Sequence, residues 1–351
     1  MKNDKTRSKI NSKSIDTKCN RKKSDRHFLD KLETTSHLFA NKSHETLYHR
    51  GIDKHLQNRK LNQLIDIKKI DNNYWNKQYE RSFYCNHVLL QEGDKLRGSL
   101  CRKRWCTTCN RIKTAELING YLEPLTDLAK EDTLFFVTLT APTCKERELK
   151  AEIKKRLKTF TRIKNNMRQT YKMKLNGYRK IECTYNENED RYHPHLHLIV
   201  QGYTEALKLL ELWLKSYKNT PKERKAKMQG QHIVEITENE KIRSLKELFK
   251  YATKGSVKNS IEAHAENTIH RALVGIRIYQ PYGKIKKVKQ PSEAKEDITP
   301  IQNNWLTSNN EIWVFKTSIK DWTNAMNDKL VNTLDIENKV KLLRELHPES
   351  D

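Results

Sequence analysis

Residues 192–200 limit the possible folds of this chain more than any other segment, because their alternation predicts a strand with three histidines on one face. Side chains two positions apart share a face of extended backbone, so His193, His195 and His197 project together. Leu196 faces the opposite side. Two neutral imidazoles on one rigid strand are half of a metal site. The alternative is that these histidines are half-buried strand residues with ordinary hydrogen bonds.

The neighbouring segments predict the sheet to which this strand belongs. Residues 178–185 have the pattern of a second strand, and the polar turn 186–190 joins it to the histidine strand, as is typical of an antiparallel pair. The other expected strands cover 134–140, 231–237 and 274–279, and the expected helices cover 112–129, 145–173, 205–217, 241–254 and 261–273. This order favours an α+β fold: a central antiparallel sheet with helices on one side.

Composition and pattern divide the chain into four segments. Residues 1–75 are rich in Lys, Arg, Asn and Ser, so we expect a basic, largely disordered arm that either holds DNA nonspecifically or acts as a solubilising tail. Residues 76–130 contain a cysteine-rich segment and a helix, and residues 131–290 contain the α+β domain. Residues 291–351 are expected to be mostly helical.

The overall charge limits the classes of partner. The formal net charge is +25, which favours a polyanion such as nucleic acid, because each neutralised phosphate releases counterions. No apolar run has the length needed to span a bilayer, and the N-terminus is polar, so we expect a cytoplasmic protein without a membrane partner. In that reducing compartment, the seven cysteines are expected to be thiols or metal ligands instead of disulfides.

A third ligand for the histidine pair should come from a neighbouring strand. Glu182 lies on the strand that is expected to pair with the histidine strand. One carboxylate and two imidazoles, with positions left open, suit Mg²⁺ or Mn²⁺ acting as a Lewis acid on a phosphate. Taken alone, Glu182 fits an exposed strand carboxylate better than a metal ligand.

The expected helix over 241–254 presents a second reactive group. Glu247, Tyr251 and Lys254 are spaced by four and three residues, so they share one helix face. A tyrosine beside a carboxylate and a lysine can act as a covalent nucleophile, provided that a cation or metal favours its phenolate, since the ordinary tyrosine pKa is near 10. The alternative is an amphipathic helix with a core tyrosine and solvated charges.

Three segments occur in one order: the strand 136–140, the His195-Leu196-His197 pair, and Tyr251 with a lysine three residues later. In this order and spacing, residues 80–290 resemble the HUH endonucleases, specifically the rolling-circle plasmid replication initiators with one catalytic tyrosine. The resemblance implies a palm of the ferredoxin or RRM type for this domain. It also implies that the histidine pair binds a divalent metal.

The resemblance further implies a mechanism. Tyr251 would nick one strand of plasmid origin DNA, single-stranded at the nick, and form a 5′-phosphotyrosyl link that is later religated. Glu247 matches the glutamate that activates water at termination, and Lys254 would stabilise phosphate or phenolate charge. A host helicase and DNA polymerase would be partners. Alternatives are a single-tyrosine transposase or mobilisation relaxase of the same fold, or a non-catalytic, zinc-containing nucleic-acid-binding regulator with structural histidines.

A cysteine cluster precedes these motifs. Cys101, Cys106 and Cys109 include a Cys-x-x-Cys pair at zinc-knuckle spacing, and either Cys85 or His87 could complete a structural zinc site. We favour Cys85, because a thiolate gives a closed four-cysteine site. The resemblance supports zinc, since similar initiators carry a cysteine-rich segment before the first motif. The flanking cations are candidates for contacts with DNA phosphates: Arg102, Lys103, Arg104, Arg111 and Lys113.

Overall fold

The computed structural model of the chain describes residues 42–67, 73–92, 95–218, 225–237, 244, 248–249, 259–288 and 311–334. The expected catalytic residues Glu247, Tyr251 and Lys254 lie outside the described residues, as does segment 1–41 of the basic arm. Within the described segments, no helix is long and apolar enough to cross a membrane.

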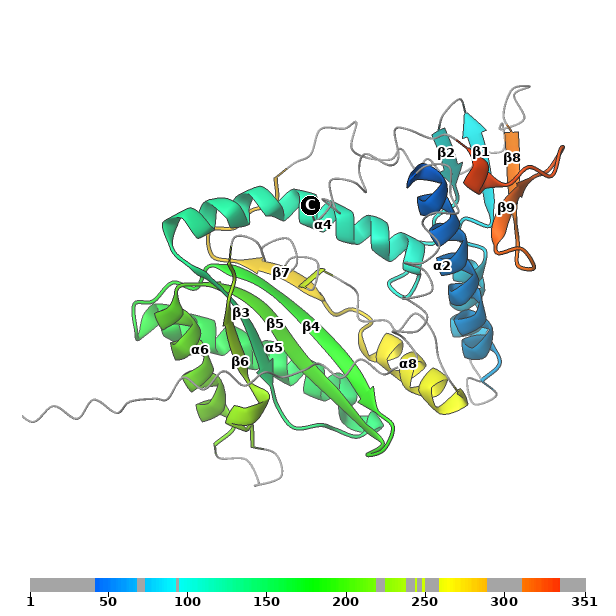
Figure 1. The fold of residues 1–351 in the computed structure, drawn as a ribbon. Helices are drawn as coiled ribbons and strands as arrows, with labels where there is room; N and C mark the ends of the chain where they lie inside the picture. The colour runs from blue at the N-terminus through cyan, green and yellow to red at the C-terminus, as the bar shows by residue number, and fades with distance from the viewer. Residues whose placement is uncertain are drawn as a thin grey trace, which may run out of the picture.

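A five-stranded antiparallel sheet forms the centre of the larger half of the molecule (Figure 1). Its strands, in spatial order, are β6 (His232–Glu235), β3 (Leu134–Thr140), β5 (Arg191–Gln201), β4 (Gly177–Asn186) and β7 (Tyr279–Tyr282). The expected α+β class and the antiparallel β4–β5 pair are therefore confirmed. β7 begins later than the expected strand over 274–279, because the chain turns at Gly275, whose φ is +75°.

Two helices, α5 (Leu149–Gln169) and α6 (Tyr203–Ser216), cover one face of this sheet. The alternation of β5 explains the packing, because Leu198 and its neighbours at every second position join Ile153 of α5 and Trp213 of α6 in the main core. The structure adds a third layer, since α4 (Thr107–Glu131) lies over part of the opposite face (Figure 1). A further helix, α8 (Ser260–Ala272), packs beside α5 and β4.

A second, four-stranded antiparallel sheet joins the two ends of the described chain. Its order is β2 (Lys95–Gly98), β1 (Val88–Glu92), β8 (Glu311–Lys316) and β9 (Asp321–Asn324). Helix α2 (Lys42–Ile65) packs on α3 (Asn73–Phe83) and lies beside β9. Short 3₁₀ turns complete the fold at Glu146–Glu148 (η2), Met228–Gly230 (η4) and Val331–Thr333 (η7).

The structure differs from the expectations at both ends of the described chain. The described part of 291–351 contains strands β8 and β9 and the short 3₁₀ turn η7 instead of α-helices, because Trp313 and Phe315 alternate into a core against β1. The segment 1–75, expected to be largely disordered, contains a helix over Lys42–Ile65 that is longer than the short helical stretches expected near residues 61–70 and that buries Leu61 and Leu64 completely. The helix is difficult to predict from composition, because the segment is mostly polar and its few apolar residues lie where the helix packs against the rest of the protein.

Candidate metal centres

Three potential ligands meet on the two central strands of the large sheet. One ligand atom from each of Glu182, His195 and His197 lies within 4.8 Å of the others. The strand register explains the cluster, because β4 and β5 pair Glu182 directly with His195, and Lys180 with His197. All four side chains project from the face opposite α5, since Leu196 and Leu198 at the intervening positions belong to the main core.

Hydrogen bonds fix how the two imidazoles point. Nδ1 of His195 donates to the carbonyl oxygen of His193 at 2.9 Å, which leaves Nε2 with a free lone pair. Nδ1 of His197 lies 3.2 Å from Oγ1 of Thr138 on β3, while its Nε2 lies 3.5 Å from Oε2 of Glu182. Metal-ligating histidines are commonly held through their second nitrogen in this way. The sequence had marked Thr138 only as part of a strand; its position opposite His197 in the β3–β5 register reveals this contact.

Burial sets the charges of the cluster. It lowers the pKa of His197 to about 3 and that of His193 to about 4, and it also lowers the pKa of His195. Burial alone would raise the pKa of Glu182, but the Lys180 ammonium and the two imidazoles outweigh it and hold that pKa below its usual value. At neutral pH the site therefore presents neutral imidazoles and one carboxylate, a donor set that suits a divalent cation.

Lys180 is a site residue that sequence reasoning missed. Its Nζ lies 2.7 Å from Oε2 of Glu182, and only 3% of its side chain is exposed. The sequence contains a pattern that predicts this contact, because Lys180 stands two positions before Glu182 and so shares its face of β4. His193 also shares the histidine face, where its ring stacks on His195 with centroids 5.1 Å apart, but it is not one of the three converging ligands.

The residue Phe249 anchors a distant segment on the same face. Its ring packs against Tyr178 of β4 at 4.9 Å and is completely buried. Its carbonyl oxygen accepts hydrogen bonds from Thr114 Oγ1 of α4 at 3.1 Å and from Tyr279 Oη of β7 at 2.9 Å. Tyr178 precedes Glu182 by four residues on one face of β4, so the chain at Phe249 lies over the same side of the sheet as the three ligands.

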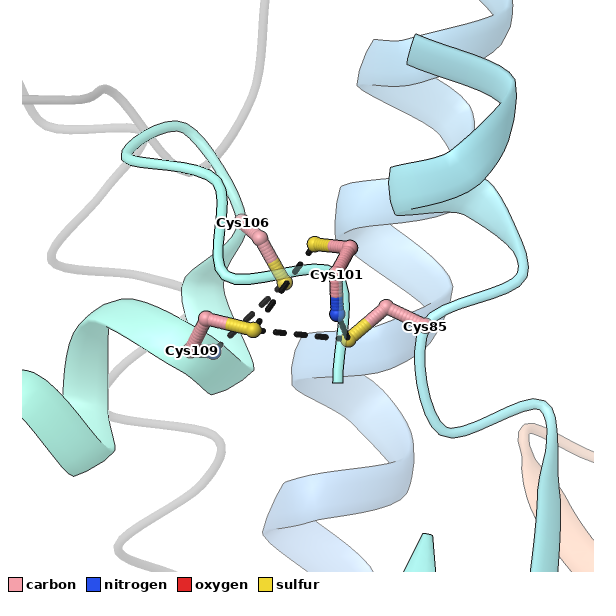
Figure 2. Close-up of side chains that lie close together, drawn as sticks. All are labelled: Cys85, Cys101, Cys106 and Cys109. Atoms are coloured by element: carbon pink, nitrogen blue, oxygen red, sulfur yellow. Dashed lines mark hydrogen bonds between the residues drawn. The ribbon is translucent and has the colours of Figure 1, made fainter. Parts of the chain in front are cut away.

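Four cysteines form a second cluster at the start of α4 (Figure 2). The sulfurs of Cys85, Cys101, Cys106 and Cys109 lie within 4.8 Å of one another, with Cys109 at 3.6 Å from Cys85 and 3.7 Å from Cys101. Tetrahedral zinc with Zn–S bonds of about 2.3 Å separates its sulfurs by about 3.8 Å, so the spacing fits zinc. Cys85 occupies the fourth position, and His87 is not part of the cluster.

The backbone around the four thiols is arranged to support negative charge. The amide of Cys101 donates to Cys85 Sγ at 3.4 Å (Figure 2). The amide of Arg102 donates to Cys109 Sγ at 3.2 Å. Cys106 is the N-cap of α4, and its sulfur accepts from the amide of Cys109. Amide donors at thiolate sulfurs are typical of the outer shell of a metal site. None of the described cysteines forms a disulfide.

Three of the five cations that were expected to contact DNA already have partners within the protein. Arg104 donates to the carbonyl oxygen of Leu273 at 2.9 Å. Arg111 forms an ion pair with Asp53 at 3.4 Å, and Lys113 forms one with Glu116 at 2.9 Å. The other two, Arg102 and Lys103, lie beside the cysteine cluster, where Arg102 is exposed.

The comparisons with known proteins all find similarity to replication proteins. The sequence profile of a family described as "Replication protein" matches residues 94–328. A Protein rep of Staphylococcus aureus is 26% identical over 188 residues, which is 46% of this chain and 79% of that protein. A Protein rep of Streptococcus pneumoniae serotype 2 is 29% identical over 163 residues, 43% of this chain and 50% of that protein. A Protein rep of a Bacillus species is 25% identical over 167 residues, 43% of this chain and 54% of that protein. The chain thus spans about half the length of the latter two relatives. No solved structure matches.

Proposed function

Because this chain belongs to the Replication protein family, we propose that it is a plasmid replication initiator that nicks one strand of its origin by tyrosine transesterification. The observation that carries the proposal is the convergence of Glu182, His195 and His197 on one face of the sheet. In this proposal the three residues hold Mg²⁺ or Mn²⁺, which when bound polarises a phosphate and stabilises its developing charge. The lowered pKa of each imidazole and the hydrogen bonds at Nδ1 support that role.

Tyr251 is the proposed nucleophile. Its phenolate oxygen forms a bond to the scissile phosphorus as the bond to the 3′-oxygen breaks, and the departing 3′-oxygen takes up a proton. The products are a 5′-phosphotyrosyl link and a free 3′-hydroxyl. Attack of a 3′-hydroxyl on the link reverses the exchange, so religation needs no other energy source.

The anchored residue Phe249 supports this assignment. It lies two residues before Tyr251, so covalent geometry limits the separation of their Cα atoms to about 7 Å. Phe249 packs on Tyr178, which shares its face of β4 with Glu182. Because only two peptide bonds separate Tyr251 from Phe249, the proposed nucleophile is held close to the side of the sheet that carries the three ligands.

Two further groups complete the proposed reaction. Lys254 stabilises the charge of the phosphate or the phenolate. Glu247 acts as a general base for water after one round, which releases the enzyme instead of allowing a second initiation. The four cysteines hold Zn²⁺ as a structural ion that orders the segment before α4.

The proposed partners follow from the products of the nick. The substrate is plasmid origin DNA, single-stranded at the cleaved position, and the cations Arg102 and Lys103 contact its phosphates. A host DNA polymerase extends the free 3′-hydroxyl and a host helicase unwinds the duplex, both in the cytoplasm. The match to the Replication protein family favours this role over a transposase or a relaxase of the same fold.

The test is covalent capture on origin DNA. The full chain with Mn²⁺ is expected to relax a supercoiled plasmid that carries its origin and to form a covalent adduct with a labelled origin oligonucleotide. Tyr251→Phe should abolish the adduct, whereas Tyr203→Phe, at an exposed tyrosine of α6, should leave it unchanged. An adduct that survives in Tyr251→Phe contradicts the assignment. A wild-type protein that binds the plasmid but leaves it supercoiled identifies a non-catalytic regulator.

A further inference from the structure

The outward face of α5 is a uniformly cationic surface of the described structure. No Asp or Glu occurs from residue 153 to residue 181. Every exposed residue of α5 is either a cation or neutral. The neutral positions include Thr161, Asn165 and Gln169, which can hydrogen-bond to phosphate oxygens. The exposed cations of the helix are Lys150, Lys154, Lys155, Lys158, Arg162 and Arg168.

The central cations of this face are not used inside the protein. Among the described residues, Lys154, Lys158 and Arg162 form no ion pair. By contrast, Lys113 of α4 and Lys208 of α6 each pair with a glutamate one turn along their own helix. Like charges four residues apart on a helix destabilise it, so the row does not serve the stability of α5 itself. A row of unpaired like charges therefore points to a polyanionic partner.

This cationic face lies on the other side of the sheet from the metal ligands. α5 packs through Ile153, Phe160 and Ile163 on the face of the sheet formed by Leu196 and its neighbours at alternate positions. The histidine side chains point the opposite way, so a full sheet and a helix separate the row from them (Figure 1). DNA bound along α5 is consequently not the strand segment that occupies the metal site.

The geometry points to double-stranded DNA as the ligand of the α5 face: we infer that this helix binds the phosphate backbone of a duplex outside the nicking site. Lys154, Lys158 and Arg162 follow one another at steps of about 6 Å along the helix axis, and the whole row extends over about 27 Å. A straight, rigid row of cations suits the regularly spaced phosphates of a rigid duplex.

The same face lacks what a single strand requires. Proteins that bind single strands without sequence preference combine cations with aromatic side chains on which the bases stack. The exposed residues of α5 include no aromatic side chain, since its one aromatic residue, Phe160, is buried in the main core. Contacts from this face therefore involve phosphates and not bases, which predicts binding that is insensitive to sequence and strongly sensitive to salt.

The experiment compares two triple variants of the full chain. The first is Lys154→Gln, Lys158→Gln and Arg162→Gln, which keeps good helix formers on α5. The matched control removes three exposed cations that lie outside α5, at Lys130→Gln, Lys316→Gln and Lys329→Gln. Binding to a labelled duplex of arbitrary sequence and about 30 base pairs is measured by fluorescence anisotropy over a series of salt concentrations, alongside a single strand of the same length.

For the α5 variant, the slope of log affinity against log salt is expected to fall by about 2.7, because each lost phosphate contact removes about 0.9. Its duplex affinity should fall at least about tenfold, while its affinity for the single strand should match that of the control triple. The single variant Lys158→Gln, which perturbs the fold least, should lower the slope by about 0.9.

Two results would overturn the inference. In the first, the α5 variant has the same duplex affinity and salt slope as the control triple. The cations of α5 would then bind another polyanion, such as an acidic protein. In the second, the α5 variant loses as much affinity for the single strand as for the duplex. The cations of α5 would then contact the strand that is nicked. Duplex binding is measured without cleavage, so failure of the proposed nicking activity and failure of this inference give different results.

Discussion

Glu182 and His195 face each other directly across the β4–β5 hairpin, and the next pair on the same face of the sheet is Lys180 with His197. The carboxylate therefore has an imidazole as its cross-strand neighbour and an ammonium two residues away on its own strand, at 2.7 Å. A slip of one residue in this register would move Glu182 to the face that carries α5. Backbone pairing thus brings the three ligands together, so the site is preorganised for a metal ion.

Removal of the carboxylate charge should weaken divalent-metal binding. Glu182→Gln keeps the size of the side chain but leaves the two neutral imidazoles without an anionic ligand, so Mn²⁺ affinity is expected to fall about tenfold or more. Electron paramagnetic resonance of free Mn²⁺ measures the dissociation constant. Glu189→Gln, in the exposed hairpin turn, is the matched control and should bind Mn²⁺ as the wild type does. Equal affinity in both variants would remove Glu182 from the ligand set.

Metal binding should also persist in mild acid. An ordinary histidine with a pKa near 6.5 is about 90% protonated at pH 5.5, so two such ligands would lower metal affinity about a hundredfold between pH 7.5 and 5.5. Here burial holds the pKa of His197 at about 3, so that imidazole stays neutral over this range, and burial also lowers the pKa of His195. The decrease in Mn²⁺ affinity between these pH values is therefore expected to be less than about tenfold. A decrease of about a hundredfold at pH 5.5 would mean that both histidines titrate normally.

The local parts of this architecture were predictable from sequence. The hairpin follows from alternation on both sides of one polar turn, and its register brings Glu182 to the histidines. The four-cysteine cluster was predictable because three of its members lie close together in the sequence, within one short segment. The roles of Thr138 and Lys180 were missed because they depend on register and burial, although both positions were on strands that the pattern had identified.

The second sheet could not be anticipated, because its central pair joins distant parts of the chain. β1 pairs with β8, so Leu89 lies opposite Trp313, and neither strand alone indicates its partner. The helix over 42–65 was hidden for a different reason. Lys60 is a buried cation that composition counts as polar, yet it lies 3.5 Å from Glu266 of α8 in the folded chain. Composition alone does not reveal such compensating partners.

Loss of one thiol should remove the structural zinc. The sulfur of Cys109 lies 3.6 Å from that of Cys85 and 3.7 Å from that of Cys101, so Cys109→Ser is expected to lower bound zinc from one ion per chain and to lower the melting temperature by about 10 °C. Zinc content by atomic absorption and melting by circular dichroism measure the two effects. Cys144→Ser, at a buried thiol outside the cluster, should retain the ion. Full zinc content in Cys109→Ser would contradict a four-cysteine site.

Asp321 should make the stability of the second sheet depend on pH. Burial raises the pKa of its carboxyl to about 6, against the lowering effect of the backbone amides of Trp322 and Asn332. The folded state therefore binds more protons than the unfolded state between pH 4 and 6, so the free energy of unfolding decreases as pH rises through this window and is constant above it. Asp321→Asn cannot ionise and keeps an oxygen for the Trp322 amide, so it should be about 1 to 2 kcal/mol more stable than the wild type at pH 8 and lose this advantage at pH 4. Urea unfolding at both pH values measures the difference, with Asp328→Asn, at an exposed carboxylate, as the control. A wild type and Asp321→Asn with the same pH dependence would show that this carboxyl titrates normally in the folded protein.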